Sequence, residues 1–449
     1  MQKVRGSSPR RSTIPRWLKS SLTKVVVGYF GSWNVWDRAY FPKDIPVDHL
    51  THVNYAFATV APDGTCALLD PWPDYQRPFS AAESVDGVAD VPGQALMGNF
   101  NQLRKLKAAN PQLGFLISIR GWSDSTHFST AAATPESRAR FVGTCIDMLL
   151  DGDLPSEGRI GGKGVASGVF DGIDIDWEYP VHPGETQEED RPEDKVNATL
   201  LFREFRRQLD EREARTGRHH LLTAAIPGGN RQSTLSYELA EIAQTLSWIN
   251  VMTYDTHGPW QSYSAFNSPF ETDPLDPIDP QSKPAASVVG TVRYFLSEGV
   301  PPEAIVIGVP FYARQYARVL DVDRGLYQSF DNAGLDGSSW ESSDAPTYRD
   351  LVDVGRILEP SSGARPPRGR NGFTRCWSDA AKVPWLYKPP AAGSDDGLGT
   401  FISYDDPTSI AQRVELIREL GLRGAMIWEI SHDSDAHELS RELSRLLRE

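Results

Sequence analysis

Short runs of β-branched and aromatic residues alternate along this chain with segments whose apolar residues recur at helical spacing. This alternation is the pattern of βα units around a parallel sheet. Helix boundaries support it, because Thr134 and Pro135 suit a helix start, and a later helix begins at Asp406 and Pro407 and closes at Gly421. Eight such units predict an α/β fold, a (β/α)8 TIM barrel. The predicted strands are residues 24–33, 49–60, 113–121, 168–180, 220–228, 248–255, 304–314 and 424–431.

The connection after the seventh predicted strand is too long for an ordinary loop. Residues 315–402 separate that strand from the helix before the eighth strand. We expect them to form a small α+β insertion subdomain, with the barrel made of residues 24–314 and 403–449. Aromatic residues of this insert would wall one side of a cleft, namely Trp340, Tyr348, Trp377, Trp385 and Tyr387.

Residues 1–23 are basic and contain no acid. They lack the apolar stretch of a secretory signal peptide, so we expect a disordered tail, with a transit peptide as the less favoured interpretation. The whole chain is 39% hydrophobic and 24% charged, which is ordinary for a water-soluble globular protein, and no apolar run is long enough to cross a membrane. A net charge of −14 argues against nucleic acid as a partner and favours a neutral substrate.

The three cysteines, Cys66, Cys145 and Cys376, are far apart and form no CxxC pair. Their spacing suggests neither a zinc site nor a disulfide framework. A single bridge between Cys66 and Cys376 is disfavoured, and whether any cysteines pair stays open.

The stretch "FDGIDIDWEYP", residues 170–180, places four acids in a predicted strand. Side chains alternate across a strand, so Asp174, Asp176 and Glu178 share one face at successive separations of about 6.6 Å. The interleaved apolar residues then point to the helices. The acids face the barrel axis and approach its carboxyl end, where barrel enzymes place their chemistry. Asp171 has the opposite parity, and for it a capping or orienting role is at least as favoured as a reactive one.

A solvated or ion-paired acidic edge is the plainer alternative for this strand. It is disfavoured because Ile173, Ile175 and Trp177 alternate with the acids, and the stretch supplies no cations. Three stacked carboxyl groups cannot all ionise cheaply, so they share protons. A protonated Glu178 beside an ionisable Asp pair supplies the acid and the stabilising charge that cleavage of a glycosidic bond needs.

The stretch "DGIDIDWEYP" resembles the DxxDxDxE signature of the family 18 glycoside hydrolases, the chitinase family, and all four acids are present. Further segments are similar to the strand motifs of that family, in order and spacing over about residues 24–445: "VVGYFGSW", "YAF", "SIRGW", "MTYD", "GVPFYAR" and "GAMIWEI". The insert matches the subdomain of the deep-cleft branch, which implies a groove that holds several sugars.

The resemblance implies hydrolysis of β-1,4 bonds between N-acetylglucosamine units with retention, in which the substrate's acetamide oxygen is the nucleophile. Glu178 would protonate the glycosidic oxygen and later activate water. Asp176 would orient the acetamide and stabilise the oxazolinium ion, while Asp174 shares its proton. Tyr254 would donate to the acetamide carbonyl, and Asp255 would support the sugar and the acid.

The substrate-binding positions follow from the same resemblance. Tyr29 and Ser118 would hydrogen-bond the inner aspartate, and Trp428 would form the floor on which the sugar stacks. The remaining candidates would contact the sugars of this and neighbouring subsites: Phe57, Gly121, Trp122, Tyr179, Met252, Trp260 and Arg314. The family usually has a second glycine where this chain has Arg120, which puts the cleavage pattern in doubt more than the activity.

Two other functions are also compatible with the sequence. An endo-β-N-acetylglucosaminidase acting on glycans is one, and a catalytically silent chitin-binding lectin of the same fold is the other, although such lectins typically lose the acid at the Glu178 position. We expect no cofactor, no metal and no membrane partner, and a monomer. The function implies secretion, whereas the sequence shows no signal peptide, so a cytoplasmic location is the alternative.

Overall fold

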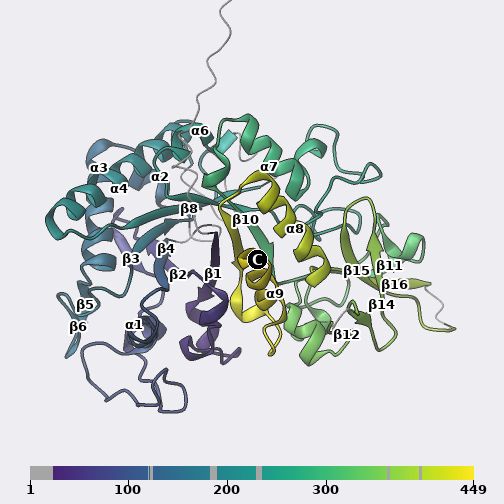
Figure 1. The fold of residues 1–449 in the computed structure, drawn as a ribbon, viewed down its shortest axis with the longest axis horizontal. Helices are drawn as coiled ribbons and strands as arrows, with labels where there is room; N and C mark the ends of the chain where they lie inside the picture. Colours follow the sequence, from purple (N-terminus) through teal and green to yellow (C-terminus); the bar gives the residue numbers. More distant parts are fainter. Residues whose placement is uncertain are drawn as a thin grey trace, which may run out of the picture.

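Eight parallel strands close into a barrel in the computed structural model, which describes residues 24–119, 121, 125–182, 190–228, 235–361, 365–393 and 397–449 (Figure 1). The strands lie in the order β1, β17, β10, β9, β8, β7, β4 and β2, and β1 also pairs with β2. The predicted TIM barrel is therefore confirmed. The strand bounds are β1 Val25–Gly31, β2 His52–Val60, β4 Gly114–Ile119, β7 Gly172–Ile175, β8 Leu221–Pro227, β9 Trp248–Met252, β10 Ile305–Pro310 and β17 Gly424–Trp428. The short strand β3 (Cys66–Leu68) pairs antiparallel with the end of β2.

The barrel strands divide their side chains between two cores, as the alternation of a strand requires. In β7, Ile173 and Ile175 are fully buried in the layer between strands and helices. The barrel interior is filled by a second cluster, which includes Val25, Val27, Tyr29, Ala56, Trp248, Val306 and Met426. Asp174 lies on the inner side of β7 and is also fully buried.

Helices cover the outside of the barrel and follow the predicted start and stop signals. The Thr134 side chain accepts a hydrogen bond from the backbone N–H of Ser137, and α8 runs from the Asp406 cap to Gly421, which has a left-handed φ of 70°. The helix bounds are α1 Gly98–Ala109, α2 Phe128–Ala132, α3 Pro135–Cys145, α4 Asp194–Thr216, α6 Leu239–Ala243, α7 Val288–Ser297, α8 Pro407–Leu420 and α9 Glu438–Arg448.

A second, antiparallel sheet lies between β10 and β17 in the sequence, in the order β11, β16, β15 and β14. In Figure 1 it occupies one end of the long axis, away from α1 and the hairpin of β5 (Leu154–Glu157) and β6 (Ile160–Gly162). A two-stranded sheet of β12 (Leu358–Glu359) and β13 (Arg368–Gly369) accompanies it. The larger sheet consists of β11 Arg314–Leu320, β14 Thr374–Ser378, β15 Val383–Lys388 and β16 Leu398–Ser403. The predicted subdomain boundaries, 315 and 402, stay a prediction.

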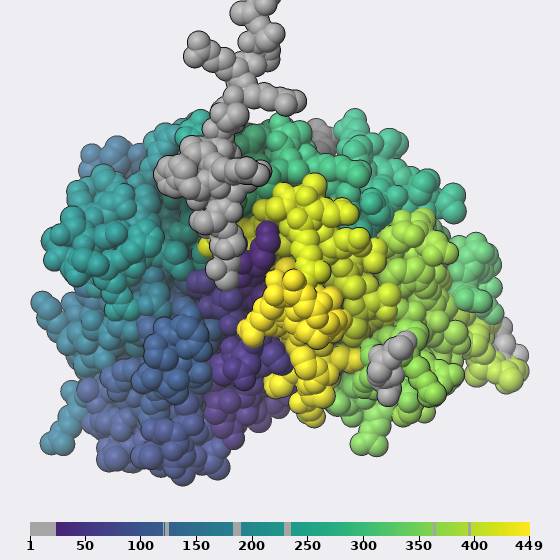
Figure 2. Space-filling model, viewed as in Figure 1, coloured from purple at the N-terminus to yellow at the C-terminus, as the bar shows by residue number. Residues whose placement is uncertain are grey.

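The first and last barrel elements lie side by side because β1 pairs with both β2 and β17. Figure 2 shows the same closure on the surface, where the purple N-terminal segments adjoin the yellow C-terminal helices. Cys66, Cys145 and Cys376 are buried free thiols. Among the helices that the structure describes, none combines the length and the apolar composition needed to span a bilayer.

Candidate active site

The strand with the acids ends earlier than the sequence suggested. β7 stops at Ile175, so Asp176 and Glu178 lie just beyond its carboxyl end. The predicted alternation persists there, because the Trp177 ring packs on Phe128 in the outer core, with ring centroids 5.4 Å apart. Asp176 and Glu178 instead line a cavity of about 790 Å³. The expected division of this segment into an inward face that carries the acids and a core face therefore agrees with the structure.

Asp171, at the start of the segment, lies away from this cavity. Its carboxylate forms 2.6 Å ion pairs with Lys107 and Arg218 and accepts the backbone N–H of Phe115. Partial burial raises the pKa of Asp171, but the bonds from Lys107 and Phe115 outweigh this effect and the pKa lies below its usual value. Asp171 thus joins β7 to its neighbours, which matches the orienting alternative.

Asp174 is the centre of a buried hydrogen-bond network. Its Oδ2 accepts from the hydroxyls of Tyr29 (2.7 Å) and Ser118 (2.8 Å). Its Oδ1 accepts from the Thr223 hydroxyl and from the Asn250 side-chain amide at 3.1 Å. Burial raises the pKa of Asp174, and the four donors partly offset that rise.

The register of the sheet explains how this network forms. Ser118 of β4 and Thr223 of β8 are the direct neighbours of Asp174 on either side. Tyr29 and Asn250 reach the same carboxylate from β1 and β9. Thr223 and Asn250 were not predicted; a polar residue on the inner face of an otherwise apolar strand was the signal available in the sequence.

Glu178 and Asp176 are approached closely by the backbone of Gly121. A Cβ at position 121 would lie 2.2 Å from the carbonyl oxygen of Asp176 and 2.7 Å from Cγ of Glu178. The backbone N–H of Glu178 donates to the Ser125 hydroxyl at 3.0 Å. Gly121 and Ser125, which follow β4, therefore fix the position of the Glu178 backbone.

Tyr254 and Asp255 follow β9 and line the same cavity. Burial and the carboxylates of Asp176, Asp255 and Glu178 raise the pKa of Tyr254 well above its usual value, so its hydroxyl remains a neutral donor at physiological pH. Asp255 accepts two hydrogen bonds from Arg314, from Nε at 3.0 Å and from Nη2 at 2.6 Å.

Arg314 is held between Asp255 and two aromatic rings. Its guanidinium lies 5.0 Å from the centroid of Trp260 and 5.3 Å from that of Tyr312. Burial opposes the charge, but Asp255 and Tyr312 outweigh it and the pKa of Arg314 lies above its usual value. The pairing balances the charge of Asp255, one of the acids that line the cavity with Asp176, Glu178 and Asp279.

Aromatic rings form an apolar floor beside the acids. The Trp428 ring lies 5.9 Å from Phe57, nearly parallel to it, and 5.3 Å from Tyr29. Trp33 also contacts both Phe57 and Trp428. A flat apolar surface next to hydrogen-bonding groups suits the C–H face of a sugar ring.

The structure brings most of the predicted site residues together. Those that line the cavity are Tyr29, Phe57, Gly121, Asp176, Glu178, Tyr179, Met252, Tyr254, Asp255, Trp260, Arg314 and Trp428. Asp174 and Ser118 lie beneath it in the buried network. Trp122 and Arg120 lie outside the described residues.

Other lining residues were not predicted, and half of them come from the long segment after Asp255. Irregular segments carry no periodic pattern, so their residues give no signal of where they fold back. The additional residues that line the cavity include Trp33, Gln261, Ile278, Asp279, Ser282 and Tyr312.

Comparison with known proteins agrees with this geometry. Residues 25–433 match the family described as Glycosyl hydrolases family 18. Chitinase A1 of Niallia circulans is 35% identical over 441 residues, which cover 91% of this chain and 56% of that protein. The chain therefore belongs to glycosyl hydrolase family 18, and it spans little more than half of this relative.

Solved structures give the same family. The catalytic domain of psychrophilic chitinase B from Arthrobacter TAD20 matches with a TM-score of 0.81 and 30% identity, covering 95% of this chain and 96% of that one. A family 18 N-acetylglucosaminidase from Paenibacillus barengoltzii matches with a TM-score of 0.68 and 29% identity, covering 94% and 99%.

Proposed function

We propose that this protein is a chitinase, which hydrolyses β-1,4 bonds between N-acetylglucosamine units and retains the anomeric configuration. The observation that carries the proposal is the placement of Glu178 and Asp176 in a cavity of about 790 Å³, directly above the hydrogen-bonded Asp174. The aromatic floor around Trp428 gives a sugar a surface to stack on beside these acids.

The roles of the polar residues follow from where their groups lie. Glu178 donates a proton to the glycosidic oxygen and later removes one from water. The substrate's acetamide oxygen attacks the anomeric carbon, and Asp176 stabilises the positive charge that develops on the resulting oxazolinium ring. The Tyr254 hydroxyl, neutral at physiological pH, donates to the acetamide oxygen and aligns it for attack.

Asp174 is buried beneath the cavity and supports this chemistry. Four donors partly offset the cost of ionising the buried Asp174. Asp176 follows Asp174 by two residues on the same side of the segment, so the two carboxyl groups can share a proton. Asp176 can therefore gain or lose negative charge as the oxazolinium ring forms and opens.

The lectin alternative is disfavoured because Glu178 is present and lines the cavity. We test the proposal by incubating the wild type and Glu178→Gln with N-acetylglucosamine oligosaccharides. We expect the variant to bind them while its turnover falls by about 10²–10⁴-fold, the usual contribution of a general acid. A wild type that binds without cleaving would leave the lectin as the function.

The first product also tests the mechanism. Early NMR spectra should show the starting anomer, because attack by the acetamide followed by water inverts the centre twice. An inverted first product would rule out the oxazolinium route. Faster release from glycoprotein glycans than from chitin oligosaccharides would favour the endo-β-N-acetylglucosaminidase alternative.

A further inference from the structure

The segment between Asp255 and α7 folds back under the residues that it follows. Its residues Asn267 and Ser268 are almost fully buried, with 1% and 4% of their surfaces exposed. Neither lines the cavity. Buried polar side chains of this kind are retained where their hydrogen bonds hold something in place.

Asn267 and Ser268 hold the backbone on both sides of Tyr254. The Asn267 Oδ1 accepts the backbone N–H of Asp255 at 2.9 Å, and the Asn267 carbonyl accepts that of Thr256 at 3.0 Å. The Ser268 hydroxyl donates to the carbonyl of Thr253 at 2.6 Å. Two adjacent residues thus fix three backbone groups of the segment 253–256.

This segment needs such support because Asp255 has a φ of 53°, in the left-handed region. Aspartate tolerates this conformation better than most residues, but it still costs energy and persists only where the surroundings determine it. The bond from the Asp255 N–H to Asn267 is one such determinant. The direction in which Tyr254 and Asp255 point into the cavity depends on this backbone turn.

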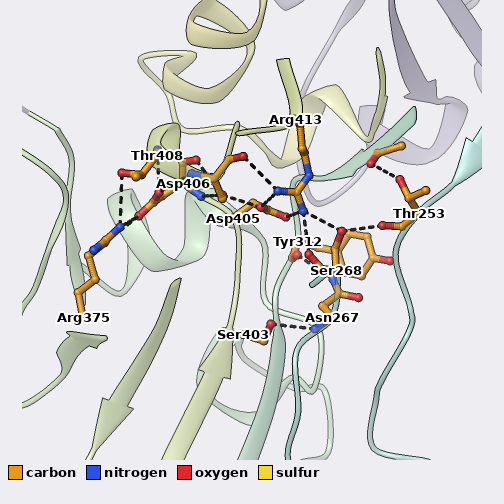
Figure 3. A network of polar contacts seen from close by, with 12 residues as sticks. Thr253, Asn267, Ser268, Tyr312, Arg375, Ser403, Asp405, Asp406, Thr408 and Arg413 are labelled. Carbon is orange, nitrogen blue, oxygen red and sulfur yellow. Dashed lines mark hydrogen bonds and ion pairs between the residues drawn. The ribbon is translucent and has the colours of Figure 1, made fainter. Parts of the chain in front are cut away.

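The pair is in turn anchored by three other parts of the fold (Figure 3). The Asn267 N–H donates to the Ser403 hydroxyl at the end of β16, at 2.8 Å, and its side-chain amide donates to the Tyr312 carbonyl at 3.3 Å. Arg413 of α8 donates to the Ser268 carbonyl and hydroxyl, both at 2.8 Å. The anchors come from the second sheet, from the residues after β10 and from α8.

We propose that Asn267 and Ser268 are positioning residues of the hydrolytic site, which fix the segment 253–256 and so orient Tyr254 and Asp255. The inference rests on the proposed function, because it assigns these residues to that reaction. Trp428 and Phe57 line the cavity but lie outside this segment, and we expect a sugar to stack on them whether or not the segment is fixed. Loss of the pair should therefore slow the reaction step more than it weakens substrate binding.

The test compares Asn267→Ala with Asn101→Ala on N-acetylglucosamine oligosaccharides. Asn101 is a matched control because it is buried in α1 and bridges Asp90 and Arg104, away from the cavity. We expect Asn267→Ala to lower kcat by about 10–100-fold, as misplacement of reacting groups does. KM should change by less than about threefold, the signature of an interaction that acts mainly in the transition state. Asn101→Ala should leave both constants near those of the wild type at an equal distance below its own Tm.

A second variant and a second measurement keep the test informative if Asn267→Ala does not fold. Ser268→Ala removes only one hydroxyl, and hydrogen exchange of a peptide spanning residues 253–256 reports directly on the Asp255 and Thr256 amides. We expect faster exchange there in Ser268→Ala and unchanged exchange in Asn101→Ala.

Different outcomes would contradict the proposed function and the positioning role. A wild type that cleaves no oligosaccharide removes the proposed function, whatever the variants do. An active wild type, together with Asn267 and Ser268 variants whose kcat and amide exchange match the Asn101 control, would overturn the positioning role alone.

Discussion

Single residues decide how closely the backbone can approach the carboxyl groups that line the cavity. The Gly121 Cα lies where an added Cβ would overlap the Asp176 carbonyl and the Glu178 side chain. The Asp176 carbonyl belongs to the backbone and cannot rotate away, so any side chain at position 121 displaces the end of β7 or the end of β4. Position 121 therefore requires glycine, because a side chain there would clash with the Asp176 carbonyl.

Gly121→Ala should lower kcat by about 10²-fold, because moving Glu178 by about 1 Å misaligns the proton donor. Gly143→Ala is the control: its Cβ would meet only the Gln208 side chain, at 3.6 Å, inside helix α3. Alanine favours a helix over glycine by about 1 kcal/mol, so this control should keep its activity and not lose Tm. Wild-type kinetics in Gly121→Ala would show that the segment relaxes without cost.

At the scale of elements, periodic segments could be predicted and irregular ones could not. The apolar runs located all eight barrel strands, and alternation within residues 170–180 separated Asp174 and Glu178 from Trp177. The end of β7 at Ile175 was not predicted, because the apolar pattern continues past the last ladder hydrogen bond. Asn267 carries no such pattern; its importance comes from contacts with residues far away in the sequence.

Helix α8 ties the second sheet to the barrel through one buried and one partly buried ion pair. Arg413 forms a 2.8 Å pair with Asp405, and Arg375 of β14 forms a 2.8 Å pair with Asp406 (Figure 3). Asp405 and Arg413 are both buried. Burial raises the pKa of Asp405, and the attraction of Arg413 opposes that rise.

Arg413→Leu should therefore lower the free energy of unfolding by about 3–5 kcal/mol at pH 7, because it leaves a buried carboxylate without its partner. Without Arg413 the pKa of Asp405 rises further in the folded state, so the loss of stability is smallest below the wild-type pKa of Asp405, grows as the pH rises from there to the pKa of the variant, and levels off above it. Denaturant unfolding at pH 4.5 and pH 7 measures the difference. Adding Asp405→Asn should recover part of the loss at pH 7, and a loss independent of pH would instead point to packing.

For the molecule as a whole, stability is linked to pH through a histidine at the end of the barrel opposite the cavity. His52 begins β2, and its ring packs on Trp248 with centroids 4.9 Å apart. Burial and the nearby Arg423 lower the pKa of His52 to about 4, against a small opposing effect of Asp171. The folded protein thus disfavours the charged ring, while the unfolded chain protonates it near its ordinary pKa of about 6.5.

The direction in which stability changes with pH follows from this difference in the pKa of His52. Above about pH 6.5 the ring is neutral in both states, and as the pH falls from there to about 4 the unfolded state gains a proton that the folded state resists, so stability falls. The full shift corresponds to at most about 3 kcal/mol. His52→Gln should flatten the decline of Tm between pH 6.5 and pH 4 while leaving kcat unchanged, because position 52 lies far from the cavity. His219→Gln, on the exposed surface, is the control. If both variants follow the wild-type Tm curve, His52 contributes nothing to the linkage, and the acid sensitivity arises from other titrating groups such as His220, whose pKa is also lowered to about 4.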